Sequence, residues 1–312
     1  MKASSAKKFE RDNNLHYELN QINCGAGGKQ TLFNAFLAVL NEGDEVILAS
    51  PYWVSYTEQI NFAKAKPKII KTTGNFKLKA VQVKEAITDK TKVILLNSPS
   101  NPAGAVIDET ELKKIAETAV ENDLIVFSDE VYESFNYEGK NPSIASYGKE
   151  IFDRTITFNA VSKSHTMTGW RLGYCGGPKE IISAMNSLQS HSTSNPCSIA
   201  QKAAIEALIG QQETVKEMKK EFLKRRNLMI SLLNEIKGIH CPTPGGAFYC
   251  FPNISKTGMN SMEFTEKLLN EALVAVVPGI AFGDDECIRL SYAVKEEEIR
   301  KGLKRMKEWV EK

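Results

Sequence analysis

Histidine and cysteine are scarce in this sequence, and neither is clustered. The 312 residues include four histidines and six cysteines, and the cysteines are scattered without a CxxC pair or a nearby group of histidines. This spacing argues against a zinc site and against a disulfide framework. We therefore expect no metal, free thiols, and a reducing compartment, the cytoplasm.

The sequence also lacks long apolar runs and an excess of charge of either sign. No stretch of 18 uninterrupted apolar residues occurs, and residues 1–18 contain no apolar segment typical of a secretion signal, so we expect neither secretion nor a membrane span. The 40 basic and 38 acidic residues leave a net charge of +2, which provides no broad attraction to nucleic acid or to an anionic membrane. A small molecule is the expected ligand.

The pattern of apolar residues predicts two folding units joined by a long helix. With 42% hydrophobic residues, the chain can bury a full core and is long enough for two domains. Short apolar runs first alternate with amphipathic segments such as 109–121 and 179–189, a pattern typical of β/α units. Short strands mixed with helices follow later. We predict a large domain over 1–198, a connecting helix over 199–232 and a small α+β domain over 233–312.

Four short apolar runs in the first unit each end at polar residues. The runs are 45–49, 93–96, 125–127 and 155–158, and their β-branched residues indicate strands of a mostly parallel sheet that is buried on both faces by helices. Ligands of such open α/β sheets bind at the carboxyl ends of the strands. The polar residues after the four runs are therefore predicted to converge on one pocket.

Lys163 directly follows the last of these strands, in the run SKSHTMTGWRLGY. A lysine in this place, with Ser162 before it and Arg171 eight residues later, suits an imine-forming amine beside an anion site. A solvated surface lysine is the alternative, because most of the 40 basic side chains must be solvated. The polar residues at neighbouring strand ends favour the first interpretation.

A glycine-rich stretch over 22–30 precedes an apolar-periodic segment over 31–40. Glycines before a helix leave backbone N–H groups free to face an anion, and the helix dipole adds favourable charge, so a phosphate fits here. A Walker A loop is excluded, because Asn23 stands where its first glycine belongs and Gln30 replaces its Mg²⁺-binding Ser or Thr. From the glycines alone, a simple tight turn before a helix stays open.

Together these features describe the requirements of pyridoxal 5′-phosphate (PLP). The ring nitrogen of this cofactor needs a buried carboxylate, for which Asp129 is the candidate, although an Asp after a strand can also be a helix cap. Tyr132 and Asn101 are candidates to donate to the phenolic oxygen. Trp53 offers a flat face for the ring, although a core aromatic is its alternative interpretation.

The chain resembles the class I/II PLP-dependent aminotransferases, in particular the bacterial aspartate and aspartate/prephenate subgroup. Nine segments carry the resemblance in the family order: GGKQ, SPYWVSY, NSPSNPAG, SDEVYE, VSKSHTMTGWRLGY, QSHSTSNPCSIAQ, GGAFY, VAVVPGIAFG and IRLSYA. The resemblance implies a fold-type I transferase, which is an α/β protein with a mostly parallel central sheet, helices on both faces and a smaller C-terminal α+β domain.

The resemblance also implies a role for each site residue. Lys163 would form the Schiff base with PLP and carry the substrate proton. The remaining cofactor-binding residues and their implied contacts are Asp129 at the ring nitrogen, Tyr132 and Asn101 at the phenolic oxygen, Trp53 on the ring, and Gly28, Ser162, Arg171 and the Lys29 backbone at the phosphate. For the substrate, the resemblance implies Arg289 at the α-carboxylate and Lys29 at the distal carboxylate, with Trp53 and Asn101 beside it. A planar arginine fork suits the α-carboxylate better than a lysine does.

The implied reaction moves the amino group of L-aspartate to 2-oxoglutarate, with prephenate as a further substrate. The implied partners are amino acids, 2-oxo acids and a second copy of the chain in a homodimer. We keep two alternatives open, namely an aminotransferase specific for alanine or aromatic amino acids, and a catalytically impaired remnant that binds PLP or dimerises. The second arises because the family pattern has a further segment before the position of Met1, which includes an arm over the partner subunit.

Two histidines depart from the family pattern. His165 stands where relatives often have Tyr or Phe, and His191 where they often have Gln. His165 is two residues from Lys163 and could alter the pH dependence. We interpret both as tolerated packing or surface substitutions, because most changes away from special features are mild.

Overall fold

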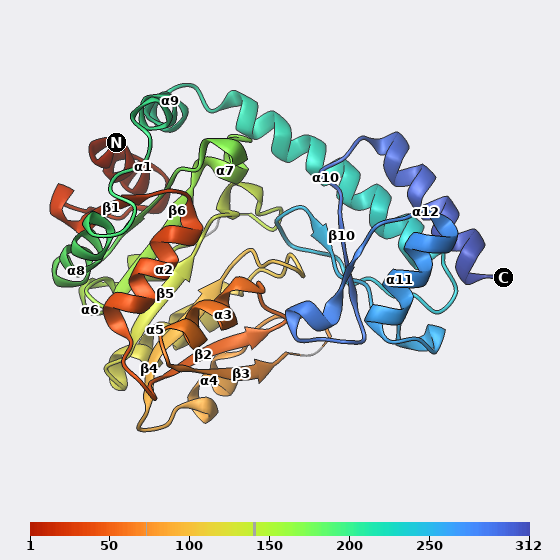
Figure 1. The fold of residues 1–312 in the computed structure, drawn as a ribbon, viewed down its shortest axis with the longest axis horizontal. Helices are drawn as coiled ribbons and strands as arrows, with labels where there is room; N and C mark the ends of the chain where they lie inside the picture. The colour runs from red at the N-terminus through yellow and green to blue at the C-terminus, as the bar shows by residue number, and fades with distance from the viewer. Residues whose placement is uncertain (73, 140–141) are drawn as a thin grey trace.

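The computed structural model describes residues 1–72, 74–139 and 142–312 of the chain. A seven-stranded sheet occupies one half of the molecule and a three-stranded sheet the other, and the long helix α10 (Glu213–Asn234) runs between the two halves (Figure 1). None of the helices in these three ranges is both long enough and apolar enough to cross a membrane.

The large sheet is mostly parallel, as predicted. Its strand order is β1-β7-β6-β5-β4-β2-β3; β2 to β6 pair in parallel wherever they are neighbours, and β7 is antiparallel to both β6 and β1. The strands are β1 (Ile22–Gly25), β2 (Glu45–Ser50), β3 (Lys66–Lys71), β4 (Thr91–Asn97), β5 (Ile125–Asp129), β6 (Thr155–Ala160) and β7 (Gly173–Gly176).

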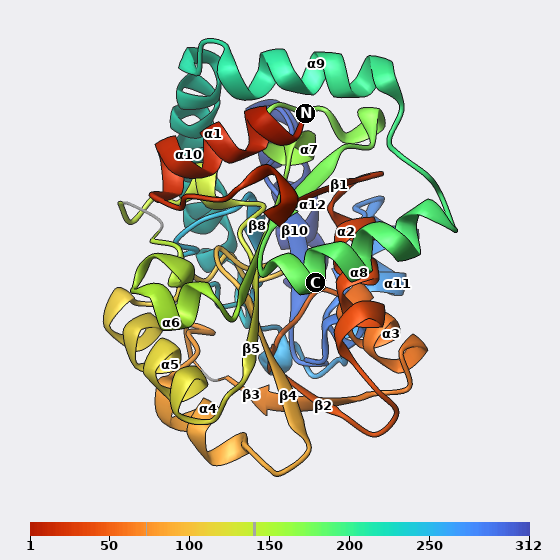
Figure 2. The ribbon, with the colours of Figure 1, turned by 90° about the vertical axis from the view of Figure 1, so that its left-hand side faces the viewer.

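Helices cover both faces of this sheet, which explains its continuous apolar runs. Successive side chains of a strand point to opposite faces, so Ile94 belongs to one core cluster and Leu95 to another. The Leu95 face packs under α2 (Gly28–Val39), α3 (Ser55–Phe62) and α8 (Lys179–Ser190). The Ile94 face packs under α4 (Ala80–Ala86), α5 (Glu109–Glu121) and α6 (Lys149–Phe152), as Figure 2 shows from the side.

A third cluster of buried residues lies at the β1 edge of the sheet. There α1 (Lys2–Asn13), α7 (Val161–Ser164) and α9 (Ser198–Ile209) pack around β1 and β7. Phe9 of α1 is fully buried and forms edge-to-face contacts with Tyr17 and Tyr174 at ring-centroid distances of 5.3 Å. The N-terminal helix is therefore anchored to the sheet.

The smaller half is an α+β unit. Its antiparallel sheet has the order β8-β10-β9, with β8 (Tyr249–Cys250), β9 (Val277–Pro278) and β10 (Ile288–Ser291). Helices α10, α11 (Ser261–Ala272) and α12 (Glu296–Val310) share one apolar cluster with this sheet. Ile299, Leu303 and Met306 of α12 are all buried at helical spacing, which places one face of that helix on the core.

The segment predicted as one connecting helix consists of two helices. Residues 199–232 are divided between α9, which ends at Ile209, and α10, which begins at Glu213. Gly210 adopts an extended conformation (φ −71°, ψ −170°), and glycine has a low helix propensity. The Gln212 side chain donates hydrogen bonds to the carbonyl oxygens of Ala207 and Gly210 and so stabilises the break. The domain boundaries themselves stay predictions.

Candidate active site

A cavity of about 340 Å³ lies at the carboxyl ends of β4, β5 and β6, beside the small sheet. Its location follows the rule for open α/β sheets, and its volume is within the range of small-molecule sites. The ten residues predicted from the sequence all line it: Gly28, Lys29, Trp53, Asn101, Asp129, Tyr132, Ser162, Lys163, Arg171 and Arg289. The structure thus brings together every predicted site residue.

Asp129, the last residue of β5, is buried and accepts two hydrogen bonds. The Tyr56 hydroxyl donates to its Oδ2 at 2.7 Å, and the Val131 N–H donates to its Oδ1 at 3.2 Å. Burial raises the pKa of the Asp129 carboxyl, and the two donors oppose that shift. Asn97 Nδ2 also donates to the Asp129 carbonyl oxygen at 3.0 Å. This environment is suited to holding a cationic partner away from water.

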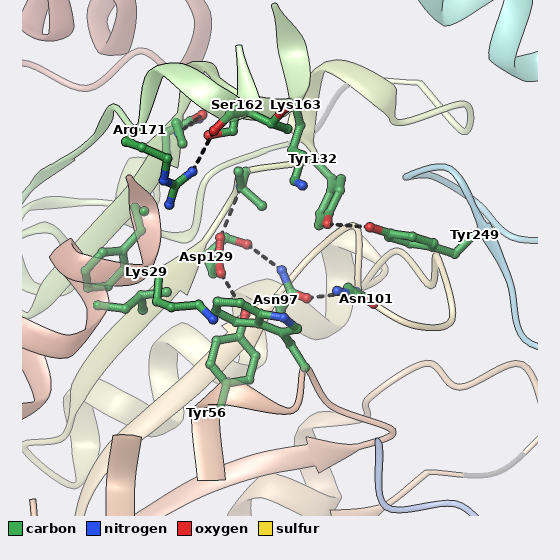
Figure 3. Close-up of a pocket in the computed structure, with 18 of the residues that line it drawn as sticks. Lys29, Tyr56, Asn97, Asn101, Asp129, Tyr132, Ser162, Lys163, Arg171 and Tyr249 are labelled. Carbon is green, nitrogen blue, oxygen red and sulfur yellow. Dashed lines mark hydrogen bonds between the residues drawn. The ribbon is translucent and has the colours of Figure 1, made fainter. Parts of the chain in front are cut away.

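Tyr132 faces the same cavity from the turn after β5. Its hydroxyl lies 3.1 Å from the hydroxyl of Tyr249, which belongs to β8 in the smaller half (Figure 3). Burial raises the pKa of Tyr132 well above its ordinary value of 10.0, so this residue is a neutral phenol and a hydrogen-bond donor at physiological pH.

Arg289 reaches the cavity from β10 and connects the two halves of the molecule. Its Nη1 donates to Asn101 Oδ1 at 2.9 Å, and its guanidinium lies 4.7 Å from the Tyr249 ring centroid and 4.8 Å from that of Phe282. Asn101 is fixed in turn by its backbone N–H, which donates to Asn97 Oδ1 at 2.9 Å. The two aromatic rings hold the arginine fork in position for a planar anion.

Lys163 lies on the four-residue helix α7 directly after β6. Its amine points into the space between Arg171, Asp129 and Tyr132 (Figure 3). Burial lowers the pKa of Lys163, and the positive charges of Arg171 and Arg289 lower it further. A larger fraction of the amine is therefore neutral, and able to attack a carbonyl carbon or accept a proton, than for a solvated lysine.

Gly28 and Arg171 line the end of the cavity at the start of α2, next to Gly27. Gly27 precedes α2 with φ +89°, and a β carbon there would lie 2.4 Å from Arg171 Nη2, so no larger residue fits without displacing the arginine. Arg171 Nη1 donates to the Thr168 carbonyl oxygen at 2.8 Å. The first N–H groups of α2, its dipole and this guanidinium together favour an anion.

Lys29 and Trp53 form the side of the cavity nearest α2 and α3. The Lys29 Nζ atom lies 5.0 Å from the centroid of the Trp53 ring, a distance typical of a cation–π contact. Trp53 packs edge-to-face on Tyr56 at 5.2 Å between ring centroids. The indole therefore borders the cavity and is fixed from behind.

Five polar residues that line the cavity have no role assigned to them from the sequence: Tyr56, Asn97, Asn159, Thr168 and Tyr249. The position of Asn97 at the end of β4 is enough to predict that it faces the cavity. The spacing of Tyr56, three residues after Trp53, is weaker evidence of the same kind. No local pattern predicts Tyr249, because its position at the cavity depends on how the smaller half packs against the sheet.

The donor set fits PLP. It includes an amine of lowered pKa, a buried carboxylate for a ring nitrogen, phenol and amide donors for a phenolic oxygen, an aromatic face, and an anion site at a helix start. The architecture, a mostly parallel seven-stranded sheet with a smaller α+β unit, is that of the fold-type I PLP-dependent transferases.

Comparison with known proteins agrees with this class. The family model for aminotransferase class I and II matches residues 1–306. The chain is 47% identical to an aspartate aminotransferase of Bacillus sp. (strain YM-2), over 99% of this chain and 81% of that protein. It is 44% identical to an aspartate/prephenate aminotransferase of Cereibacter sphaeroides, over 98% and 80%. A crystal structure of the aspartate aminotransferase from Rhizobium meliloti superimposes with a TM-score of 0.96 at 40% identity, over 99% and 81%.

The chain belongs to the class I and II aminotransferases. This family assignment confirms the resemblance inferred from the nine sequence segments, and with it the α/β fold and the enzyme class.

Proposed function

We propose that this enzyme binds PLP in the cavity and transfers the amino group of L-aspartate to 2-oxoglutarate, giving oxaloacetate and L-glutamate. The observation that carries the proposal is the convergence of the Lys163 amine, the Asp129 carboxylate and the Arg289 guanidinium on one cavity. The relatives named aspartate aminotransferase support the choice of amino donor.

When bound, PLP supplies an aldehyde carbon that condenses with amines and a protonated ring that accepts electron density. Asp129 would hold the proton on the ring nitrogen, and Tyr132 and Asn101 would donate to the phenolic oxygen. Trp53 would stack on the ring. The phosphate would be held by the remaining residues of the anion end, namely Gly28, the Lys29 backbone, Ser162 and Arg171.

Lys163 serves as the covalent anchor and as the base. Because its pKa is lowered by burial and by two arginines, the Lys163 amine would take the proton from the substrate Cα and deliver it to the aldehyde-derived carbon of PLP. Its position on a short helix beside the buried strand β6 limits its motion, so that the amine stays near the reacting carbon.

Substrate carboxylates are recognised by two cations. Arg289 receives the α-carboxylate in a bidentate pair, and Lys29, beside Trp53, receives the distal carboxylate of aspartate or glutamate. Prephenate also carries two carboxylates, and one relative is named an aspartate/prephenate aminotransferase. Prephenate is therefore the second amino acceptor to test.

The test is a turnover assay of purified protein supplied with PLP, aspartate and 2-oxoglutarate, with oxaloacetate as the measured product. We expect turnover in the wild type and none in Lys163→Ala. Faster turnover of alanine or of aromatic amino acids would contradict the aspartate assignment. Uptake of PLP without turnover of any amino acid would contradict the proposed activity and favour a protein that only binds the cofactor.

We also propose that the active form is a homodimer. The resemblance to the aminotransferase family implies this assembly, and the side chains of Trp170, Leu188 and Ile199, which are 37–72% exposed, are available for a contact with a second copy. Light scattering of the protein as it leaves a size-exclusion column should give a mass twice that of the 34.7 kDa chain. A mass of one chain at micromolar concentration would contradict the proposal.

A further inference from the structure

A buried charged cluster lies directly behind the cofactor-facing residues of the site. Glu130 directly follows Asp129 in the chain, and Glu133 directly follows Tyr132. The carboxyl groups of the two glutamates contact α1 and do not line the cavity. Lys8 of α1, with only 5% of its surface exposed, forms an ion pair with Glu133.

Asn13, at the end of α1, binds both glutamates at once. Its Nδ2 donates to Glu133 Oε2 at 2.6 Å and to Glu130 Oε2 at 3.2 Å, and its Oδ1 accepts from Lys8 Nζ at 2.7 Å. Glu130 Oε1 also accepts from the hydroxyls of Ser128 at 2.8 Å and Ser143 at 2.7 Å. Both carboxyl groups are thus fully engaged, and among the described residues Lys8 of α1 is the only cation within ion-pair distance of either one.

The cluster reaches the cavity through Asn159. This residue lines the cavity four positions before Lys163, and its Nδ2 donates to Glu133 Oε1 at 2.6 Å. Its Oδ1 accepts from the N–H of Ala160, the residue before α7. Glu133 therefore connects the turn after β5 with the end of β6.

Charge balance determines how the cluster holds together. Burial raises the pKa of Glu130 to about 8, and the neighbouring Glu133 carboxylate raises it in the same direction. At neutral pH Glu130 is then protonated, and the Lys8 ammonium pairs with the buried Glu133 carboxylate and with the partly exposed Asp12 carboxylate, which lies 3.8 Å away. Removing Lys8 would leave a buried carboxylate without a counter-charge, an arrangement that strongly disfavours the native geometry.

We propose that Lys8, Asn13, Glu130 and Glu133 form a positioning network, by which α1 holds Asp129 and Tyr132 in the arrangement that binds PLP. These are positioning residues, since none of the four lines the cavity. The inference rests on the proposed PLP site. It assigns to the N-terminal helix a role in cofactor retention.

A double-mutant cycle tests the network. Lys8→Met leaves Glu133 charged and unpaired, and Glu133→Gln removes the charge at the other end. We expect Lys8→Met to weaken PLP binding to the apoenzyme about tenfold or more, as expected when a buried charged group loses its partner. The double variant should bind PLP more tightly than Lys8→Met, because neither side chain is then charged.

Two readouts separate positioning from general loss of stability. The first is the PLP dissociation constant, compared with that of Ile115→Ala, which opens a cavity in a different core cluster and lowers the melting temperature without contacting the network. The second is the induced circular dichroism of the cofactor at saturation, which reports the ring's surroundings. We expect both to change in Lys8→Met and neither to change in Ile115→Ala.

The outcomes are distinguishable. If the wild type binds PLP and Lys8→Met binds it equally well with the same dichroism, the positioning network is refuted and the proposed function stands. If the wild type binds no PLP, the proposed function fails and the inference fails with it. Should Lys8→Met not fold, Glu133→Gln alone decides, because it too must weaken PLP binding and alter the dichroism.

Discussion

The hydroxyl of Tyr56 donates a 2.7 Å hydrogen bond to Oδ2 of Asp129, and both side chains are buried. The two residues come from different elements, α3 and the end of β5. The phenol stabilises the ionised form of Asp129 and so opposes the rise in pKa that burial causes. Tyr56 thereby supports the charge that the proposed function requires of Asp129.

Replacement of Tyr56 by phenylalanine tests this relationship. Loss of a hydrogen bond to a charged group costs about 1.5–3 kcal/mol, and the pKa of Asp129 should rise further. We expect Tyr56→Phe to weaken PLP binding by about 10-fold to 100-fold and to lower kcat. Tyr147→Phe is the matched control, because the Tyr147 hydroxyl is buried without a hydrogen-bond partner among the described residues. Equal PLP affinities in the two variants would contradict the role of Tyr56.

Lys163 should destabilise the apoenzyme while enabling the reaction. Its pKa lies below the ordinary 10.5, so between the lowered value and 10.5 the unfolded chain binds more protons than the folded one, and stability rises with pH. Lys163→Met should abolish this rise, leave the apoenzyme at least as stable at neutral pH, and reduce turnover by at least about 10²–10⁴-fold. The predicted pH dependence is checked by the melting temperatures of the wild-type and Lys163→Met apo proteins across pH 7–11. A difference in melting temperature that does not change with pH would refute it.

Lys29 should discriminate between substrates. Lys29→Ala removes the cation proposed to bind the distal carboxylate, so the KM for aspartate should rise about 10-fold to 100-fold, the cost of one lost charged hydrogen bond. The kcat/KM for alanine, which has no distal carboxylate, should stay nearly constant. Lys29→Arg, which retains the charge, serves as the control. An equal loss for aspartate and alanine would show that Lys29 acts on the cofactor or on the fold.

Glu130 should make the protein less stable as the pH rises. Its pKa is raised from 4.5 to about 8, so between these values the folded state binds more protons than the unfolded state, and the free energy of unfolding falls with increasing pH. Glu130→Gln keeps the shape and removes this contribution. The variant should gain stability relative to the wild type as the pH is raised from 5 to 9, as measured by urea unfolding. Glu263→Gln, at a partly exposed glutamate on α11, is the control. A free-energy difference between Glu130→Gln and the wild type that stays constant from pH 5 to 9 would contradict the prediction.

Local patterns were sufficient for the elements whose own residues determine them. The segment 109–121 was predicted from its amphipathic spacing and forms α5 over Glu109–Glu121, with acidic residues in its first turn. The rule for the carboxyl ends of parallel strands predicts that Asp129 and Lys163 meet in one cavity, and both line the cavity in the structure.

Features that depend on distant parts of the chain could not be predicted. The edge strand β3 contains Lys66, Lys68 and Lys71. These lysines interrupt the apolar run by which a strand is recognised in the sequence, and charged residues of this kind are typical of a protected sheet edge. The ion pair of Lys8 with Glu133 joins residues 125 positions apart, and no local periodicity reports such a contact. The break between α9 and α10 depends on how one glutamine side chain folds back on Gly210.

Gly173 of β7 lies so close to the start of α2 that a β carbon on it would be 2.2 Å from the Gly28 nitrogen. Although Gly173 is not among the residues that line the cavity, any side chain there would push the first turn of α2 outward and rotate its N–H groups away from an anion. A methyl group added to a strand can therefore disrupt the proposed phosphate site while every residue that lines the cavity remains unchanged. Variants of this enzyme found in nature or in the laboratory should accordingly be judged by their distance from backbone junctions as well as from the ligand.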